Sequence, residues 1–420
     1  MKKSIVSLII IASFQIVYPQ SGWFIINPPT NQLLQGIYFI DSNRGFCGGG
    51  SNVFLSNNGG NSWSAIQGMD GNSIFFLNSN TGFIQGQNLY KTTNNGNNWI
   101  TISTLDPYAT YYDIFFINEN LGFRCGGFHF STSNYIRIQK TTNSGINWSV
   151  NFSVYSNSNF KDIDFIDSLL GFCTGGELLC KTTNGGINWI TTYPSIDGMQ
   201  YYSLYFLNDM TGFLCGNRSR ILKTTNGGNN FFAYNLISND EFYSIYFINE
   251  NIGYSVGKGG KIIKTSNIGI SWDYQFPITN NDLYDVYFLN IYTGFAVGMN
   301  GVAIKTTDGG GAIGINQIGN NKPVDFSLRQ NYPNPFNPVT KIRFDIPSVG
   351  AQYIEPVQLK VYDIIGREVA TLVNEQLKPG TYEVEWPAPM GDGNNFASGV
   401  YYYKLITGEY TESKKMILLR

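Results

Sequence analysis

The chain of 420 residues has a single histidine, His129, and only 13% charged residues, with a formal net charge of −2. One imidazole cannot build a histidine-rich zinc site, and any Ser-His-Asp set would have to use that one residue. The small and nearly balanced charge leaves no basic face for the phosphate backbone of nucleic acids. These scarcities argue against a histidine-based zinc enzyme and against nucleic acid as a partner. The sequence predicts no metal site and no cofactor.

Cysteine is also scarce, and the five cysteines do not have metal-ligand spacing. Four of them come shortly after a Gly-Phe step, where we expect small buried hydrophobic residues; these are Cys47, Cys125, Cys173 and Cys215. Cys173 and Cys180 could face each other across one hairpin, so a disulfide between them stays open. An odd number leaves at least one thiol unpaired within a monomer.

Long hydrophobic runs are missing, apart from one near the start of the chain. Lys2 and Lys3 precede a largely apolar run over 5–17. About 13 residues suit the core of a signal peptide better than a membrane span, which needs about 20. We therefore predict a signal peptide at residues 1–20 and no transmembrane span after its cleavage, with an uncleaved anchor as the alternative.

Glycine and aromatic residues, in contrast, are abundant and repeat together. A Gly-aromatic step recurs seven times, followed each time by a polar stretch such as Thr182-Thr183-Asn184-Gly185-Gly186-Ile187-Asn188-Trp189. In the later copies the period is about 41 residues, and a unit of this size must stack on copies of itself to bury its apolar face. The steps are Gly45-Phe46, Gly82-Phe83, Gly122-Phe123, Gly171-Phe172, Gly212-Phe213, Gly253-Tyr254 and Gly294-Phe295.

Each unit contains four short runs of aromatic and β-branched residues separated by Gly and Asn. In the fifth copy these runs begin at Leu204, Gly212, Ile221 and Phe231. Four antiparallel strands at this period are typical of a β-propeller blade, and we name them strands a to d. We expect the Asn and Gly residues to close the c–d turn and the aromatic that ends it to pack between neighbouring sheets.

The seventh copy is incomplete, because Ile313 stands where the closing aromatic should be. The segment from Ser21 to Pro28, which contains Trp23, looks like the end of a repeat with nothing before it. We predict that this segment supplies strand d of the last blade. The result is an all-β, seven-bladed propeller over residues 21–318.

These repeats resemble Asp-box (BNR-type) propellers, in particular the group similar to photosystem II assembly factors. The resemblance implies the fold, but the box is shared by enzymes and by binding proteins. In this chain Asn occupies the acidic position of the box in six copies, and only the seventh has an acid, Asp308.

The composition changes near Asn316, and short alternating strands with turn signals follow a linker at 319–325. They predict a small Ig-like β-sandwich over 326–420. Its motifs are Asn-Tyr-Pro-Asn-Pro-Phe-Asn-Pro from Asn331, Val-Tyr-Asp from Val361, Gly-Val-Tyr from Gly399 and Lys414-Lys415-Met416. They resemble the type A C-terminal sorting domain of the type IX secretion system. An ordinary ligand-binding Ig-like module is the alternative.

The sorting resemblance implies that the secretion machinery reads the C-terminal domain and that the protein is secreted or held at the outer cell surface. The resemblance also implies that Lys414, Lys415 and Arg420 belong to the tail that the machinery recognises. The alternative is that these residues simply lie on a solvated terminal strand.

Catalytic residues are hard to find in the repeats. A sialidase needs three convergent arginines, but Arg44 and Arg218 are expected on opposite faces. A glycosidase needs two carboxylates about 5–9.5 Å apart. Asp113, Asp162 and Asp285 recur just before strand a and could surround the axis. Duplication of one ancestral repeat would also explain why an aspartate recurs at this position. We predict no catalytic residues and no enzymatic activity, with a glycoside hydrolase or sialidase-like enzyme as the alternative.

A ligand-binding face is easier to place. The d–a and b–c connections share one face of a propeller, and tyrosine recurs there at Tyr112, Tyr202, Tyr243 and Tyr284. The third copy also has an insertion with His129 and Tyr135 that should project from the same face. Aromatic faces suit sugar rings or peptide side chains. We predict an exported propeller that binds a glycan or a protein through these residues, with an envelope assembly factor as a further alternative.

Overall fold

The computed structural model describes residues 22–420 apart from 104–107, 131–132, 195–197, 237–239, 276–277, 311–315, 320–322, 338, 348–356, 376, 378, 388–397, 409 and 420. The predicted signal peptide and Arg420 lie outside the described residues. Within them, no helix is both long and apolar enough to span a bilayer.

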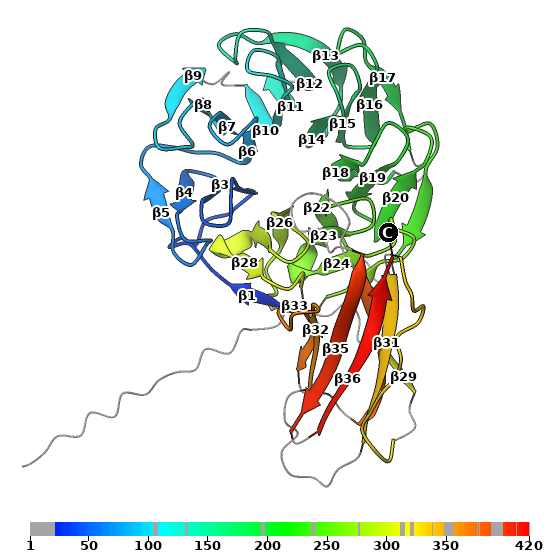
Figure 1. Cartoon of the computed structure of the whole chain (residues 1–420). Coiled ribbons are helices and arrows are strands. Elements are labelled where there is room, and N and C mark those ends of the chain that lie inside the picture. The colour runs from blue at the N-terminus through cyan, green and yellow to red at the C-terminus, as the bar shows by residue number, and fades with distance from the viewer. Residues whose placement is uncertain are drawn as a thin grey trace, which may run out of the picture.

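Seven four-stranded antiparallel sheets surround a central axis (Figure 1), so the predicted seven-bladed propeller is confirmed. Each sheet except the last is built from consecutive strands. Blade 1 has β2 (Gly36–Phe39), β3 (Gly45–Gly49), β4 (Asn52–Ser56) and β5 (Ser64–Ile66); blade 2 has β6 (Ser73–Phe76), β7 (Gly82–Gln85), β8 (Leu89–Thr92) and β9 (Ile100–Ser103); blade 3 has β10 (Ala109–Phe116), β11 (Gly122–Phe130), β12 (Ser133–Thr141) and β13 (Ser149–Tyr155). Blade 4 has β14 (Asp162–Phe165), β15 (Gly171–Gly175), β16 (Leu178–Thr182) and β17 (Ile190–Thr192); blade 5 has β18 (Tyr201–Phe206), β19 (Gly212–Gly216), β20 (Arg220–Thr224) and β21 (Phe232–Asn235); blade 6 has β22 (Phe242–Phe247), β23 (Gly253–Gly257), β24 (Ile262–Thr265) and β25 (Asp273–Tyr274).

Blade 7 joins the two ends of the propeller sequence. It contains β26 (Leu283–Phe288), β27 (Gly294–Gly298) and β28 (Ala303–Thr306), and its outer strand is β1 (Trp23–Ile25). Trp23 lies opposite Thr306 in an antiparallel pair, and the Gly22 N–H donates to Asp308 at 2.9 Å. The predicted closure of the ring by the N-terminal segment is therefore confirmed.

The c–d turn has the same hydrogen bonds in blade after blade. In blade 4 the Thr182 hydroxyl accepts from the Gly186 N–H at 2.9 Å, and the Asn184 side chain accepts from the Asn188 N–H at 2.9 Å. Positive φ occurs at Gly185 and Gly186, not at Asn184. The asparagine therefore closes the turn with its side-chain oxygen, and the two residues after it take the left-handed backbone.

In blade 4 the aromatic that ends the turn packs between two neighbouring blades, as predicted. Trp189 lies edge-on to both Phe123 and Phe165, with ring centroids 6.3 Å and 6.0 Å away. Phe123 from blade 3 and Phe165 from blade 4 are themselves stacked at 4.4 Å. Lys140 crosses the same interface and donates to the Gly185 carbonyl at 2.8 Å. One aromatic cluster and one lysine bond thus join these two blades.

The C-terminal domain consists of two four-stranded antiparallel sheets packed on one core, as a small β-sandwich. One sheet has the order β29 (Asn316–Gly319), β34 (Gly380–Pro387), β31 (Val339–Ile346) and β30 (Ser327–Leu328). The other has the order β33 (Glu368–Glu375), β32 (Val357–Tyr362), β35 (Gly399–Thr407) and β36 (Tyr410–Leu418). β29 begins ahead of position 326, where the sequence predicts the sandwich to start, because its backbone pairs with the edge of β34.

Candidate binding face

The b–c turns and the d–a connections emerge from one end of the propeller, because the four strands of each blade are antiparallel and consecutive in space. Strand a begins at this end of the propeller, which we call the binding face, and in four blades it has a β-bulge near its first residues. The extra residue of each bulge is a tyrosine, inserted between the paired positions that flank it. A bulge redirects a side chain out of the regular alternation of a strand. The four bulged residues form what we call the tyrosine rim: Tyr112, Tyr202, Tyr243 and Tyr284.

Three tyrosines of the rim form a continuous row. The ring centroids of Tyr202 and Tyr243 are 5.4 Å apart, and those of Tyr243 and Tyr284 are 4.9 Å apart in a stacked arrangement. All three side chains are half-buried, so part of each ring is open to solvent. Burial and the nearby Glu241 carboxylate raise the pKa of Tyr202, and burial and Asp282 raise that of Tyr284. The row is therefore neutral at physiological pH.

Tyr112 is the rim tyrosine that the structure does not bring into this row. Blade 4 has a lysine, Lys161, at the rim position, and its ammonium lies 3.5 Å from the centroid of the Tyr112 ring. Burial lowers the pKa of Lys161 to about 8. The prediction of an aromatic rim thus fits blades 5 to 7, whereas in blade 3 a cation already covers one face of the ring.

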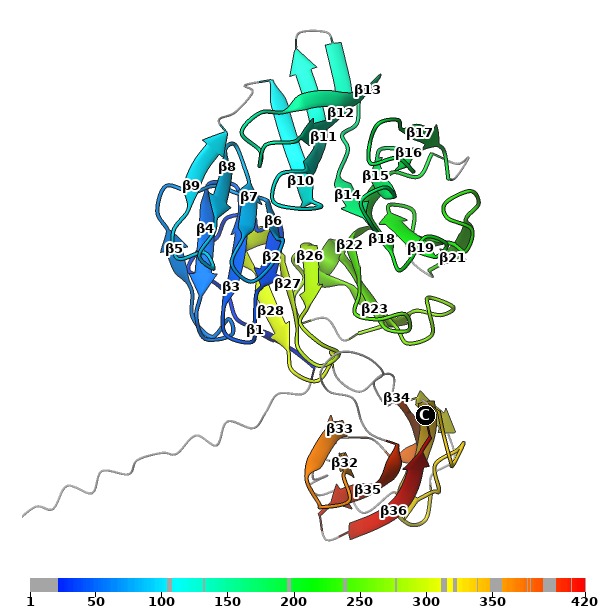
Figure 2. The ribbon, with the colours of Figure 1, turned by 45° about the horizontal axis from the view of Figure 1, so that its top comes forward.

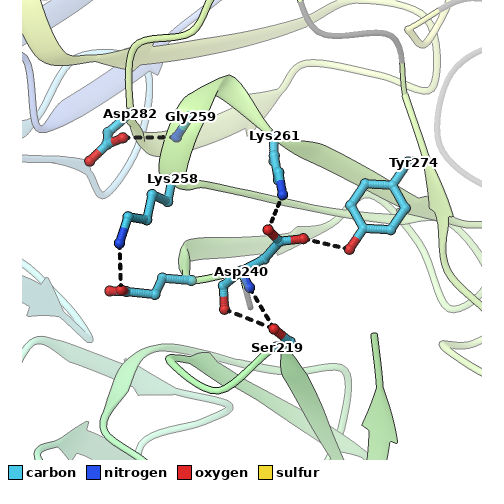
Figure 3. A network of polar contacts seen from close by, with 8 residues as sticks. Ser219, Asp240, Lys258, Gly259, Lys261, Tyr274 and Asp282 are labelled. Atoms are coloured by element: carbon cyan, nitrogen blue, oxygen red, sulfur yellow. Dashed lines mark hydrogen bonds and ion pairs between the residues drawn. The ribbon is translucent and has the colours of Figure 1, made fainter. Parts of the chain in front are cut away.

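Polar contacts support the row from the adjoining loops of blades 5 to 7 (Figure 3). Lys258 forms an ion pair of 3.0 Å with Glu241, and Asp282 accepts from the Gly259 N–H at 2.8 Å. Asp240 accepts from the Tyr274 hydroxyl at 2.7 Å and also contacts Lys261. These contacts tie the loops on either side of Tyr243 to each other.

The insertion of blade 3 projects from the binding face, as predicted. β11 and β12 each have nine residues, and this blade rises above its neighbours in Figure 2. His129 is exposed, and its two ring nitrogens lie 3.0 Å from the side-chain oxygens of Asn134 and Asn159. Tyr135 lies edge-on to Tyr155 with centroids 6.0 Å apart. Both predicted residues therefore lie on the extended hairpin, with neighbours from their own blade or its connection to blade 4.

Sequence reasoning missed a hollow of about 670 Å³ over blades 1 to 3. Blades 1 and 2 have no bulged tyrosine; the residues at the rim position are Gln35 and Asn72. Because these side chains are shorter than a tyrosine, the space next to them stays open. We call this space the blade-2 hollow; its lining is Gln35, Gly50, Ser51, Gly68, Met69, Asp70, Asn72, Gly86, Gln87, Asn88, Tyr90, Ala109, Thr110 and Tyr111.

The three carboxyl groups considered as catalytic candidates lie on the innermost strands and hold adjacent blades together. Asp113 accepts from the Ile163 N–H at 3.0 Å, Asp162 from the Leu204 N–H at 2.8 Å, and Asp285 from the Ile37 N–H at 2.9 Å. Desolvation raises the pKa of Asp285 to about 7, and desolvation together with the Asp162 charge raises that of Asp113. Their geometry has an evident structural use, which is to join each blade to the next.

The cysteines are free thiols with buried side chains. Cys173 and Cys180 do face each other across β15 and β16, as the sequence suggested, but they form no disulfide. Burial raises the pKa of both thiols. Among the described residues, no group of three or more His, Cys, Asp or Glu side chains is arranged to hold a metal ion.

The Asn-Tyr-Pro-Asn-Pro-Phe-Asn-Pro motif wraps around the end of β36 in the C-terminal domain. Phe336 is 2% exposed, packs on Trp386, and exchanges main-chain hydrogen bonds with Ile417 and Leu419. The Asn334 side chain accepts from the Ile417 N–H at 2.9 Å. Lys415 on the same strand is exposed, and Lys414 pairs with Glu412 at 3.0 Å. The motif therefore fixes the strand on which both predicted recognition lysines lie.

Residues 330–419 match the family model of the secretion system C-terminal sorting domain. The C-terminal domain is a type IX sorting domain. A protein with this domain is secreted or attached to the outer cell surface, which confirms the predicted localisation. No curated protein matches the chain.

Solved structures similar to the chain are β-propellers. YCF48 bound to D1 peptide is 18% identical with a TM-score of 0.57, and covers 69% of this chain and 98% of its own. YCF48 from Cyanidioschyzon merolae is 15% identical with a TM-score of 0.55, and covers 68% of this chain and 98% of its own. PorZ, an essential surface component of the type IX secretion system of Porphyromonas gingivalis, is 14% identical with a TM-score of 0.51. That match covers 94% of this chain and 60% of PorZ. At these identities the similarity shows the fold alone.

Proposed function

We propose that this protein is an exported, non-enzymatic propeller that binds a glycan or a protein ligand through its binding face. The sorting domain directs it to the type IX secretion machinery, and the propeller is the part that meets the ligand. The observation that carries the proposal is the row formed by Tyr202, Tyr243 and Tyr284. In blades 5 to 7, a bulge at the same position of strand a places each tyrosine of this row on the binding face.

The energetics of such a row favour binding. Tyrosine offers a large, stiff apolar surface with a polar end, and aromatic contacts contribute about 0.5–1.5 kcal/mol beyond the area they bury. The Lys258–Glu241 ion pair and the Gly259–Asp282 hydrogen bond already connect the neighbouring loops in the free protein. These loops therefore lose little conformational freedom when a ligand docks. A propeller of the same fold, YCF48, has been captured with a peptide, which supports a binding role for this architecture.

A non-enzymatic role fits the use made of the candidate catalytic groups. Asp113, Asp162 and Asp285 each accept a main-chain hydrogen bond from the next blade. A carboxyl group used in this way is poorly placed to move onto a substrate as acid or nucleophile. A glycoside hydrolase or sialidase-like enzyme and an envelope assembly factor are the competing proposals, and the experiments below separate them.

The test is binding of the full-length secreted protein to glycan and peptide arrays, with a Tyr243→Ala variant beside it. We expect bound spots for the wild type and a loss of about tenfold or more in affinity for the variant, since the central ring of the row is gone. Phe232→Ala is the matched control, because Phe232 is an exposed ring at the start of β21, beside a c–d turn of the opposite face. Equal binding by all three proteins would overturn the rim proposal. Two further measurements address the competing proposals: release of shorter sugars from polysaccharides incubated with the protein would favour the enzyme, and recovery of one envelope protein in a pull-down from cell envelopes would favour the assembly factor.

A further inference from the structure

The blade-2 hollow is built differently from the tyrosine rim. Its floor is apolar and aromatic, formed by Met69, Tyr90 and Tyr111, which are 6%, 5% and 4% exposed. Its mouth is polar, with exposed residues at Ser51, Gln87 and Thr110. The lining as a whole is therefore mixed, and a volume near 670 Å³ lies within the usual range of small-molecule sites, about 300–1,000 Å³.

The charge of the lining restricts the ligand. Among the described residues of the lining, Asp70 is the only charged one, and none of them is Lys, Arg or His. An anionic group entering the hollow would lose water and meet the Asp70 carboxylate. The buried guanidinium of Arg124 lies over the Tyr111 ring, 3.7 Å from its centroid, but it does not line the hollow. Sialic acids, uronic acids and phosphorylated groups are therefore disfavoured as occupants of the hollow.

Asp70 is also committed within the protein. One of its carboxylate oxygens accepts from the Tyr90 hydroxyl at 2.7 Å, and the other accepts from the Gln87 N–H. A Cβ on Gly86 would collide with Asp70, so the backbone there approaches the carboxylate as closely as it can. Asp70 therefore holds the wall of the hollow in shape, and the part of the lining that the structure describes has no other carboxylate to attract a cationic side chain.

What remains available to a ligand is a set of neutral groups that both donate and accept. The side chains of Gln35 and Gln87 line the hollow and have no hydrogen-bond partner among the described residues. The hydroxyls of Ser51 and Thr110 lie at the mouth and likewise have no hydrogen-bond partner among the described residues. A side-chain amide offers two donor hydrogens and an acceptor oxygen, which matches a hydroxyl group that must do both.

We propose that the blade-2 hollow is a subsite for one uncharged sugar ring of a neutral glycan. The apolar face of the ring would lie on the floor at Tyr90 and Tyr111, and its hydroxyls would bond to Gln35 and Gln87. Gln35 and Asn72 occupy the rim position in blades 1 and 2, so the hollow lies on the same face of the propeller as the tyrosine rim. The proposal rests on the proposed function and names its ligand class.

The test is isothermal titration of the full-length protein with cellohexaose, laminarihexaose, maltohexaose and mannohexaose as neutral probes. A hexamer of galacturonic acid and a lysine-rich peptide are the charged probes. We expect at least one neutral hexamer to bind and both charged probes to fail. The double variant Gln35→Ala with Gln87→Ala should lower that affinity about tenfold, as expected for two lost neutral hydrogen bonds. Gln67→Ala is the matched control, because Gln67 is an exposed glutamine near Asp70 that lies outside the lining.

A second variant pair tests occupation of the hollow independently of any single hydrogen bond. Ser51→Trp places an indole at the mouth and should abolish binding, whereas Ser42→Trp, at an exposed serine in the a–b turn of the same blade, should not. Thermal melting checks that each variant is folded.

The outcomes separate the two proposals. If the neutral hexamer binds and Tyr243→Ala weakens it while the hollow variants do not, the subsite proposal fails and the proposed function stands. Preferential binding of the acidic hexamer or of the peptide overturns the neutral-glycan assignment. If no neutral probe binds, the subsite proposal fails; if the glycan and peptide arrays are also empty, the proposed function fails with it.

Discussion

Asp285 in the seventh blade accepts a hydrogen bond from the Ile37 N–H of the first blade at 2.9 Å. Its other carboxylate oxygen accepts from the Ser244 hydroxyl of blade 6 at 3.1 Å. One side chain therefore connects three consecutive blades beside the axis, at the interface where the ring of blades closes. This is a second closure, formed at the innermost strands, in addition to the pairing of β1 with β28 at the outside.

The first prediction is that Asp285→Ala destabilises the propeller by about 1–3 kcal/mol, because the Ile37 N–H is left without its partner. Unfolding in urea, followed by tryptophan fluorescence, measures the change. Asp273→Ala is the control, since Asp273 is exposed on the outer strand β25 and should change the free energy of unfolding by less than about 0.5 kcal/mol. Equal effects of the two substitutions would contradict the assigned role.

The second prediction concerns pH and the same carboxyl group. Burial raises the pKa of Asp285 from 3.8 to about 7 in the folded state. Between these values the folded protein binds a proton that the unfolded chain has lost, so this group stabilises the fold at low pH and loses that effect as pH rises through 7. The free-energy advantage of the wild type over Asp285→Asn should therefore shrink between pH 4.5 and pH 7.5. Urea titrations at several pH values measure it, and an advantage that grew with pH would show the opposite shift.

The third prediction tests the outer closure. Trp23 is 4% exposed and lies edge-on to Tyr254 and Phe288 of the two last blades. Trp23→Ala should cost about 3–5 kcal/mol, as for other buried aromatic residues. Ile25→Ala in the same strand is the control, because Ile25 is 55% exposed and its truncation leaves no cavity. A loss for Trp23→Ala no larger than that control would mean that the ring closes without this strand.

Much of this architecture could be predicted because the residues that determine it recur at equivalent positions of the repeats. The Gly-aromatic step, the turn that Thr182 and Asn184 close, and the N-terminal segment with Trp23 each follow from comparing one copy with the next. The tyrosine rim follows for the same reason, since the bulged residue stands at a constant offset from strand a. Repetition makes a local pattern readable without any knowledge of tertiary contacts.

The blade-2 hollow could not be predicted in this way, because it depends on what two copies lack. Gln35 and Asn72 look like ordinary loop residues, and only the fold shows that the short side chains there leave an open space. β29 was missed for a related reason: its four residues pair with β34 through the backbone and need no apolar alternation. Likewise, the Lys161–Tyr112 contact joins residues from different blades and has no local signal.

The fourth prediction is that the thiols do not react in the native protein. The cysteines are buried, and burial raises the pKa of Cys173 and Cys215, so the reactive thiolate is scarce. A thiol reagent such as DTNB should give no signal with the folded chain and five equivalents after denaturation. A Ser64→Cys variant, at an exposed position of β5, is the positive control and should react once in the native state. Rapid reaction of the native wild type would place a thiol at the surface.

The fifth prediction concerns the sorting domain, where the motif from Asn331 is expected to act first through folding. Phe336 is buried against Trp386 and bonds to the end of β36, so Phe336→Ala should destabilise the sandwich by about 3–5 kcal/mol. Tyr332 belongs to the same motif but is 80% exposed, and Tyr332→Ala should leave the stability within about 0.5 kcal/mol of the wild type. Calorimetry of the full chain measures both. If Phe336→Ala left the melting of the sandwich unchanged, the buried part of the motif would have to serve recognition and not the fixing of the strand that contains Lys414 and Lys415.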